Sequence, residues 1–234
     1  VAAYLPAYAG MLMEKEVTTL TSMLENPEHP FVAILGGSKV SDKVAVIDAL
    51  IDKCDTLIIG GGMCFTFLVA QGYSVGTSLM EADWVERASE MLEKAKQKGV
   101  TILLPTDVVC ADAFANDANT VMCGVDAIPD SMMGLDIGEE TTKAYAEAIA
   151  GAKTVFWNGP MGVFEMSSFE AGTKGVALAV AANKEAATII GGGDSVAAVN
   201  KFGLADQMTF ISTGGGASME LVQGEALPGV EALK

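Results

Sequence analysis

FVAILGGSKVSDK, residues 31–43, joins an unbroken apolar run to two glycines and then to two lysines four residues apart. The apolar run does not alternate with polar residues, which is typical of a strand covered on both faces, as in a parallel sheet. Because helical patterns separate this run from others like it, the sequence predicts alternating strands and helices. The further runs are 56–59, 100–104, 154–157, 187–190 and 208–211.

Helical periodicity is clearest over Glu81–Lys98, where apolar residues recur at three- and four-residue steps before Gly99, a common helix terminator. The stretches 141–150 and 165–183 follow a similar pattern. We therefore expect an α/β fold with a doubly wound, mainly parallel six-stranded sheet and helices on both faces, in a Rossmann-like three-layer arrangement. A TIM barrel ranks second, because its closure needs about eight strand–helix units.

Two segments stand outside this alternation. The helical stretch Met11–Leu24 precedes the first strand and ends in ENPEHP, whose prolines favour extended backbone. It has the character of a connector, and we expect it to expose apolar surface. The segment 107–138 is rich in Asp, Gly and Asn and predicts a small hairpin or a long loop.

Composition excludes several classes of protein. Half of the 234 residues are hydrophobic, which argues against disorder, and the net charge of −16 argues against a nucleic-acid partner. No run of about 18 uncharged apolar residues indicates a membrane span, and no basic flank indicates a signal peptide. The four cysteines form no CxxC pair, and His29 alone completes no zinc site. We expect a cytoplasmic protein with reduced, mostly buried thiols and with His29 exposed in a turn.

Glycine clusters follow four of the apolar runs, at 36–37, 60–62, 191–193 and 214–216, and Asn158-Gly159-Pro160 follows another. The carboxyl ends of strands form the ligand crevice of doubly wound sheets. Glycine there lets backbone N–H groups approach an anion, and the next helix N-terminus adds partial positive charge. Several such exits at one edge favour a phosphate-rich ligand, although tight turns alone also select glycine.

Charged residues at these exits each have two explanations. Lys39 and Lys43, one helical turn apart at an expected helix start, indicate either a phosphate site or a solvated lysine pair. Asp194 either caps a helix or binds Mg²⁺, and Glu165 either caps a helix or accepts from a ribose. The sequences GxxxxGK[ST] and GxGxxG are absent, which leaves a dinucleotide-dependent oxidoreductase only a minor alternative.

Six motifs resemble, in order and spacing, the C-terminal, nucleotide-binding half of phosphoglycerate kinase: GGSKVSDK, IIGGGMCFTF, MGLDIG, VFWNGPMGVFE, IIGGGDS and STGGGAS. The resemblance implies that residues 1–26 form a connector helix from a missing N-terminal domain, and that residues 27–234 form a nucleotide-binding α/β domain. The family transfers a phosphoryl group between 1,3-bisphosphoglycerate and MgADP in glycolysis. We expect a monomer that binds ADP or ATP with Mg²⁺ but is nearly inactive without its arginine-rich partner half; the alternative is an adenine-nucleotide-binding module with another partner.

The resemblance also implies roles for matching residues. Lys39 would stabilise the phosphoryl group in flight, Lys43 would bind nucleotide phosphates, and Asn158 would lie near them. Asp194 would hold Mg²⁺, and Glu165 would bind the ribose. The adenosine pocket would be lined by Gly37, Ser38, Gly61, Gly134, Leu135, Pro160 and Val163. The backbone at two helix starts would face phosphate, through Gly192, Gly193, Ser195, Gly214, Gly215 and Gly216. Of these residues, Gly192 and Gly215 would make catalytic contacts. Ser38 and Cys64 stand where relatives commonly carry alanine, and these two differences remove no charge from the site.

Overall fold

The computed structural model describes residues 6–233, which fold around a parallel six-stranded sheet. Every neighbouring pair of strands in this sheet is parallel, and the chain order reverses between β1 and β7. This confirms the predicted doubly wound α/β fold, and each of the six apolar runs contributes a strand. In spatial order the strands are β3 (Thr101–Leu103), β2 (Thr56–Ile59), β1 (Phe31–Leu35), β7 (Thr154–Asn158), β8 (Ala187–Gly191) and β9 (Phe210–Ile211).

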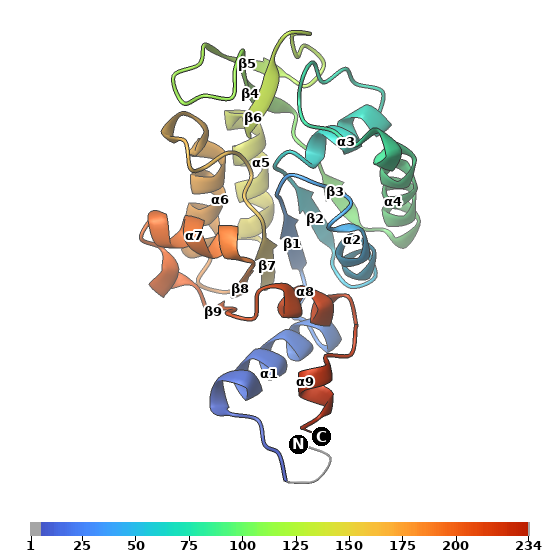
Figure 1. The fold of residues 1–234 in the computed structure, drawn as a ribbon, viewed down its shortest axis with the longest axis vertical. Helices are drawn as coiled ribbons and strands as arrows, with labels where there is room; N and C mark the ends of the chain where they lie inside the picture. Colours follow the sequence, from blue (N-terminus) through green and yellow to red (C-terminus); the bar gives the residue numbers. More distant parts are fainter. Residues whose placement is uncertain (1–5, 234) are drawn as a thin grey trace.

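Helices cover both faces of this sheet (Figure 1). One side carries α2 (Val44–Ile51), α3 (Cys64–Ala70), the 3₁₀ turn Ala82–Trp84 and α4 (Val85–Lys98); the other carries α5 (Glu139–Ala150), α6 (Ala171–Ala182), α7 (Gly193–Lys201) and the 3₁₀ turn Ala205–Gln207.

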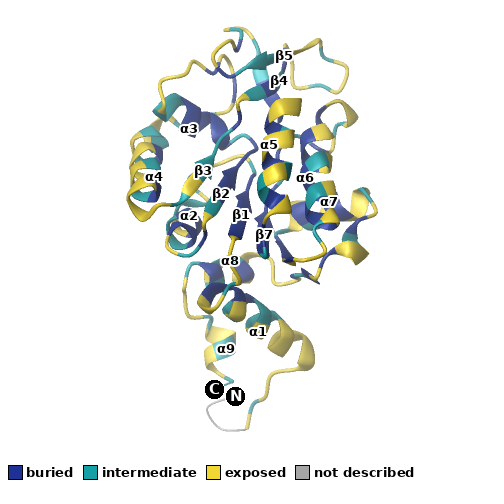
Figure 2. Cartoon of the chain, turned by 180° about the vertical axis from the view of Figure 1, so that it is seen from behind, coloured by how far each residue is buried: buried dark blue, intermediate teal, exposed yellow. Residues whose placement is uncertain are grey.

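Side chains of each central strand alternate between two cores. In β1, Phe31, Ala33 and Leu35 pack with α2 and α3, whereas Val32 and Ile34 pack with α5 and α6. All five are buried, and Figure 2 shows the central strands in dark blue between helices whose outer faces are yellow. Burial on both faces explains why the run FVAIL contains no polar residue.

The first helix, α1 (Met11–Glu25), lies with α8 (Gly216–Val222) and α9 (Pro228–Glu231) at one end of the molecule (Figure 1). Its second half packs into the core through Leu20, Met23 and Leu24. Its first turn is solvent-exposed, with Met11 89% and Leu12 63% exposed. The predicted exposed apolar surface is therefore confirmed.

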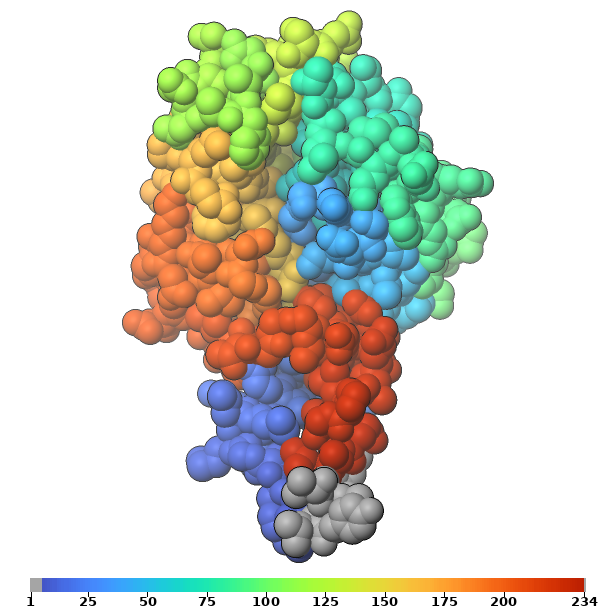
Figure 3. All heavy atoms as spheres, viewed as in Figure 1, coloured from blue at the N-terminus to red at the C-terminus, as the bar shows by residue number. Residues whose placement is uncertain are grey.

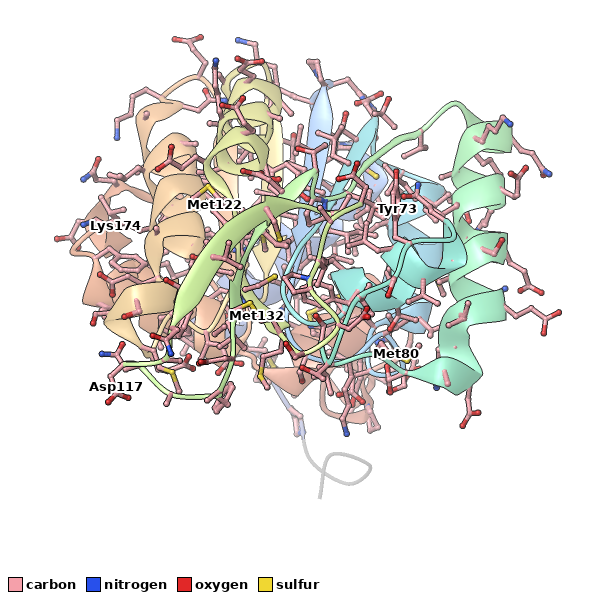
Figure 4. The ribbon with its side chains drawn as sticks, turned by 90° about the horizontal axis from the view of Figure 1, so that it is seen from above. Tyr73, Met80, Asp117, Met122, Met132 and Lys174 are labelled. Atoms are coloured by element: carbon pink, nitrogen blue, oxygen red, sulfur yellow. The ribbon has the colours of Figure 1, made fainter. Side chains whose placement is uncertain are left out.

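A second, antiparallel sheet occupies the segment between β3 and α5, in the order β5 (Thr120–Gly124), β4 (Asp107–Ala111), β6 (Met133–Ile137). Seen from above in Figure 4, this sheet crosses the top of the molecule, with Asp117 at the tip of the β4–β5 loop. The expected hairpin is present, but the sequence did not indicate β6. Its sequence MGLDI contains Gly and Asp, which are weak strand formers, so pairing with β4 makes it a strand.

Two helix starts differ from the prediction, and a third agrees with it. α2 begins at Val44, so Lys39 lies in an irregular segment rather than one helical turn before Lys43. α6 begins at Ala171, after the 3₁₀ turn Ser167–Phe169, so Glu165 is not at a helix start. Asp194 lies in the first turn of α7, so the expected helix start is confirmed there, but its carboxylate makes no capping hydrogen bond. In residues 36–43, before α2, backbone N–H groups donate to other segments instead of forming helical hydrogen bonds: Gly37 N donates to Pro160 O, and Ser41 N donates to the Glu81 carboxylate.

Other expectations about single residues are confirmed. Cys54, Cys64 and Cys110 are buried, Cys123 is half-buried, and all four thiols are free. His29 is exposed, and its Nδ1 lies 2.6 Å from the Asp55 carboxylate. Within residues 6–233, no helix combines the length and the apolar character needed to cross a bilayer.

Candidate functional site

Two adjoining cavities open where β1, β2, β7 and β8 end. The larger has a volume of about 730 Å³ and is lined mainly by apolar side chains and glycines. The smaller, of about 330 Å³, is lined by glycines and charged or polar residues. Gly37, Ser38 and Asp194 line both, so the two cavities lie side by side. Figure 3 shows the surface hollowed between the blue and teal segments that follow β1 and β2 and the orange segments that follow β7 and β8.

The larger cavity brings together the residues predicted to surround an adenosine. All eight line it: Gly37, Ser38, Gly61, Gly134, Leu135, Pro160, Val163 and Glu165. The sequence did not single out other lining residues, because they are apolar and look like ordinary core positions. These include Phe65, Leu79, Phe114, Met133 and Met166.

Backbone hydrogen bonds hold the floor of the site together. Gly36 N donates to Asn158 O at 2.9 Å, Gly37 N to Pro160 O at 3.1 Å, and Gly61 N to Met161 O at 3.0 Å. These bonds tie the ends of β1 and β2 to the end of β7. The N–H groups of these three glycines are therefore bonded within the protein and are not available to an anion; the glycines allow close backbone contact instead.

The glycines after β8 and β9 behave differently. Gly192, Gly193, Gly215 and Gly216 line the smaller cavity, and their N–H groups donate no hydrogen bond to other residues of the described range 6–233. Gly193 begins α7, so its N–H and those of the next residues are the unpaired donors of a helix N-terminus. This backbone is suited to bind an anion.

Two predicted phosphate contacts do not line the smaller cavity. Ser195 is fully buried, and its hydroxyl accepts a hydrogen bond from Gly159 N at 2.5 Å. Gly214 N donates to the Ser212 hydroxyl at 3.2 Å. For Ser195, a phosphate contact stays a prediction for its backbone N–H only.

Lysines supply the positive charge of the smaller cavity. Lys39 is exposed at its rim, whereas Lys43 is half-buried and donates from Nζ to Asn158 Oδ1. Asn158 is itself 2% exposed. Burial lowers the pKa of Lys43, and the carboxylates of Asp42 and Asp194 oppose that effect. An anion entering the cavity would stabilise the charged ammonium further.

Asp194 is the residue best placed to share a cation with a ligand. It is exposed, lines both cavities, and its carboxylate accepts no hydrogen bond from any residue in the described part of the chain. Within residues 6–233, no three or more His, Cys, Asp or Glu side chains are grouped as a metal site. One carboxylate with phosphate oxygens is a set that Mg²⁺ accepts, so the residues present fit a nucleotide-bound Mg²⁺ rather than a protein cage.

The wall formed by residues 160–166 is held from outside by Lys201, at the end of α7. Its Nζ donates to Phe164 O at 2.6 Å and lies 2.6 Å from the Glu170 carboxylate. The ammonium also lies over the Phe164 and Phe202 rings. One helix thus presents its N-terminus to the smaller cavity and fixes the larger cavity with its last residue.

A buried carboxylate, Asp136, lines the larger cavity and was not identified from the sequence. It is 4% exposed and accepts hydrogen bonds from Ile137 N at 2.9 Å and Gly172 N at 2.8 Å. Burial raises the pKa of Asp136 to about 7, although the two N–H groups act in the opposite direction. The carboxyl therefore titrates near neutral pH while linking β6 to the start of α6.

We expect Asp136 to make the protein less stable as the pH rises. Its pKa of about 7 when folded exceeds the ordinary value of 3.8, so the folded state holds the proton more tightly and loses stability as pH passes from 5 to 7. The loss attributable to this group is about 2 kcal/mol. Denaturant unfolding of the wild type and Asp136→Asn at both pH values measures it: the difference between the two proteins should change by that amount. An identical pH slope in both would contradict the prediction.

The one arginine in the sequence, Arg87, lies outside the site. It is in α4, where its guanidinium pairs with Asp48 and with Glu90, the latter at 2.6 Å. Neither cavity is lined by it. The cations of the site are therefore lysines from a single segment, residues 39–43.

Comparisons with known proteins agree with this geometry. The family model for phosphoglycerate kinase matches residues 1–225. Phosphoglycerate kinase from Moorella thermoacetica is 60% identical over 233 residues, and the cytosolic enzyme from Nicotiana tabacum is 58% identical over 236. Each match covers 100% of this chain but 59% of the relative, so the chain spans about three-fifths of the length of these proteins.

Solved structures give the same result. Phosphoglycerate kinase from Coxiella burnetii superposes with a TM-score of 0.96 at 46% identity, covering 100% of this chain and 60% of the other. The enzyme from Pyrococcus horikoshii gives a TM-score of 0.85 at 30% identity, covering 99% of this chain and 58% of the other. From its sequence, its fold and the residues gathered at its strand ends, this chain belongs to the phosphoglycerate kinase family.

Proposed function

We propose that this chain binds MgADP and MgATP and forms the nucleotide half of an enzyme that transfers a phosphoryl group between 1,3-bisphosphoglycerate and ADP. The observation that carries the proposal is that the two cavities share three lining residues: an apolar one with room for adenosine adjoins a polar one lined by two lysines and a helix N-terminus. The names of the relatives support the same activity.

In this proposal the chain binds the nucleotide along the line of the two cavities. The adenine ring lies among the apolar residues of the larger cavity, and the ribose lies near Glu165. The phosphates pass Gly37 and Ser38 into the smaller cavity. There the ammonium of Lys43 and the N–H groups at the start of α7 hold them, and Lys39 faces the transferring group from the rim.

The reaction asks little covalent work of these side chains. An oxygen of the ADP β-phosphate forms a bond to phosphorus while the bond from phosphorus to the acyl oxygen breaks, and the leaving carboxylate keeps the electron pair. No proton has to move, so no general base is needed, and no histidine lines either cavity. Bound Mg²⁺ would neutralise part of the negative charge on the phosphates. The residues of the chain position the phosphates and stabilise the charge on the group in transfer.

We further propose that the phosphoglycerate site lies in a basic N-terminal domain of the family. This chain spans about three-fifths of its relatives, and Arg87 lies away from the cavities. Two polyanions gathered in one site need more cations than the two lysines here. The chain alone should therefore bind nucleotide but turn over very little. We also propose that it is a monomer and that it acts in the cytoplasm, since the name of the tobacco relative gives a cytosolic location. Family-like turnover by this chain in a coupled assay would overturn this part.

Calorimetric titration tests the binding function directly. We expect ADP to bind, Mg²⁺ to strengthen it, adenosine to bind more weakly, and NADH to give no signal. Failure of MgADP to bind would overturn the proposed function, and binding of NADH in its place would favour a dinucleotide-dependent enzyme.

Replacing Asp194 by asparagine should selectively remove the effect of Mg²⁺, because the amide keeps the shape but loses the charge that binds the ion. The affinity of the variant for ADP should be nearly the same with and without Mg²⁺ in the calorimeter. Asp42→Asn is the matched control, since Asp42 lines the smaller cavity as well. If the Mg²⁺ effect survived in Asp194→Asn and disappeared in Asp42→Asn, the ion would bind Asp42 instead, and the prediction would be wrong.

A further inference from the structure

Glu81 holds the lysine-bearing segment from outside the site. It lies between α3 and α4, directly after Met80, which Figure 4 labels, and lines neither cavity. One carboxylate oxygen accepts from Ser41 N at 2.9 Å, and the other accepts from the Ser41 hydroxyl at 2.7 Å. Ser41 is midway between Lys39 and Lys43, so this contact falls at the centre of the segment.

Glu81 is itself fixed in place. Its N–H donates to the Thr66 hydroxyl at 3.1 Å, and Thr66 is in α3 with 1% exposure. The pKa of Glu81 is lowered by hydrogen bonds from Ser41 and Val40 and by the charge of Lys39, although burial opposes this. The carboxylate is therefore ionised, and its position is determined by the core.

The segment needs such a support because it has little other structure. Its first residues are tied to the end of β7 by the N–H groups of Gly36 and Gly37, and Lys43 N donates to Val40 O at 2.8 Å. Between these ends the backbone is neither helix nor strand. Two ammonium groups in the same short segment also repel each other when no anion is bound.

We propose that Glu81 is a positioning residue, which holds Ser41 so that the ammonium groups of Lys39 and Lys43 converge on one phosphate-binding cavity. The inference rests on the proposed nucleotide function and adds a residue from another element to it. Glu81 touches no phosphate in this arrangement. It acts through the backbone of the segment.

A second role for the same carboxylate would have the opposite effect. A negative charge close to Lys39 also weakens the positive potential that attracts phosphate, so removing it would strengthen ADP binding if electrostatics alone mattered. Positioning and counter-charge therefore predict opposite signs for Glu81→Gln. Ser41→Ala separates them further, because it removes a hydrogen bond and leaves every charge in place.

The experiment is calorimetric titration of this chain and four variants with MgADP and with adenosine. We expect Glu81→Gln to weaken MgADP binding about tenfold and Ser41→Ala about threefold, with adenosine affinity unchanged, because Glu81→Gln removes the charge that strengthens both hydrogen bonds from Ser41, whereas Ser41→Ala removes only the one from the hydroxyl. The double variant should bind MgADP no more weakly than Glu81→Gln, since both changes act on the same pair of residues. Glu86→Gln, which removes an exposed charge in the first turn of α4, is the matched control and should leave both affinities unchanged.

Unchanged or tighter MgADP binding in Glu81→Gln would overturn the inference, and so would an equal loss of adenosine and MgADP affinity, which would indicate general damage to the fold. Amide hydrogen exchange gives a readout without ligand: exchange of Ser41 N–H should accelerate in Glu81→Gln and not in Glu86→Gln. Absence of MgADP binding by the wild type would refute the proposed function itself, and the inference with it.

Discussion

Replacing Lys43 by alanine should weaken ADP binding by about 1.5–3 kcal/mol, the usual scale of a hydrogen bond to a charged group. Lys43 is the half-buried cation of the smaller cavity, and its Nζ already donates to Asn158. Its burial means that solvent screens its attraction for a phosphate less than it does for an exposed lysine. Calorimetry with MgADP measures the loss.

Two comparisons make the Lys43 result specific. Lys174→Ala removes an exposed lysine on the outer side of α6, away from the cavities, and should leave ADP affinity unchanged (Figure 4). Adenosine, which has no phosphate, should bind the Lys43→Ala variant as tightly as the wild type. An unchanged dissociation constant for ADP in Lys43→Ala would place the phosphates elsewhere.

Replacing Gly61 by alanine should lower the free energy of unfolding by about 3 kcal/mol, through close contact and backbone strain together. A Cβ at this position would lie 2.5 Å from both Gly37 N and Gly37 O, and 2.8 Å from Pro160 O. Those atoms are backbone, so they cannot rotate away as a side chain would. The residue also has φ +68°, which an L-amino acid rarely adopts.

Gly99→Ala separates the two causes. Gly99 has φ +74°, but a Cβ there meets nothing within 4 Å. This variant should therefore lose only about 1–2 kcal/mol, the cost of the left-handed backbone. Denaturant unfolding of both variants gives the comparison. Equal losses would show that the close approach of the β1, β2 and β7 ends is unimportant for stability.

The strands were predictable because of where their side chains lie. A strand covered on both faces is mostly apolar, so FVAIL and TLII are recognisable as they stand. The strand β6 was not predictable, since MGLDI contains two weak strand formers: Gly134, which packs against the Phe65 ring, and Asp136, which is buried. Its conformation depends on pairing with β4, 20 or more residues earlier.

The candidate site was predictable in part for a similar reason. Glycines and lysines next to strand ends are local features, and those at 37, 39, 43, 192 and 193 do line the two cavities. The helix starts assigned to Lys39 and Glu165 were wrong, because contacts with other segments decide where a helix begins. Phe114 and Asp136 reach the larger cavity from distant parts of the chain.

The sequence by itself determined the layers of this protein and the chemistry at their edge, because burial and backbone freedom select residue types one position at a time. It did not determine which glycine N–H groups are available to a ligand. Those of Gly37 and Gly61 are bound to the end of β7, whereas those of Gly193 and Gly216 face a cavity. Only the tertiary structure decided this, and it also placed Glu81 against Ser41, since hydrogen bonds between segments far apart depend on how the chain packs.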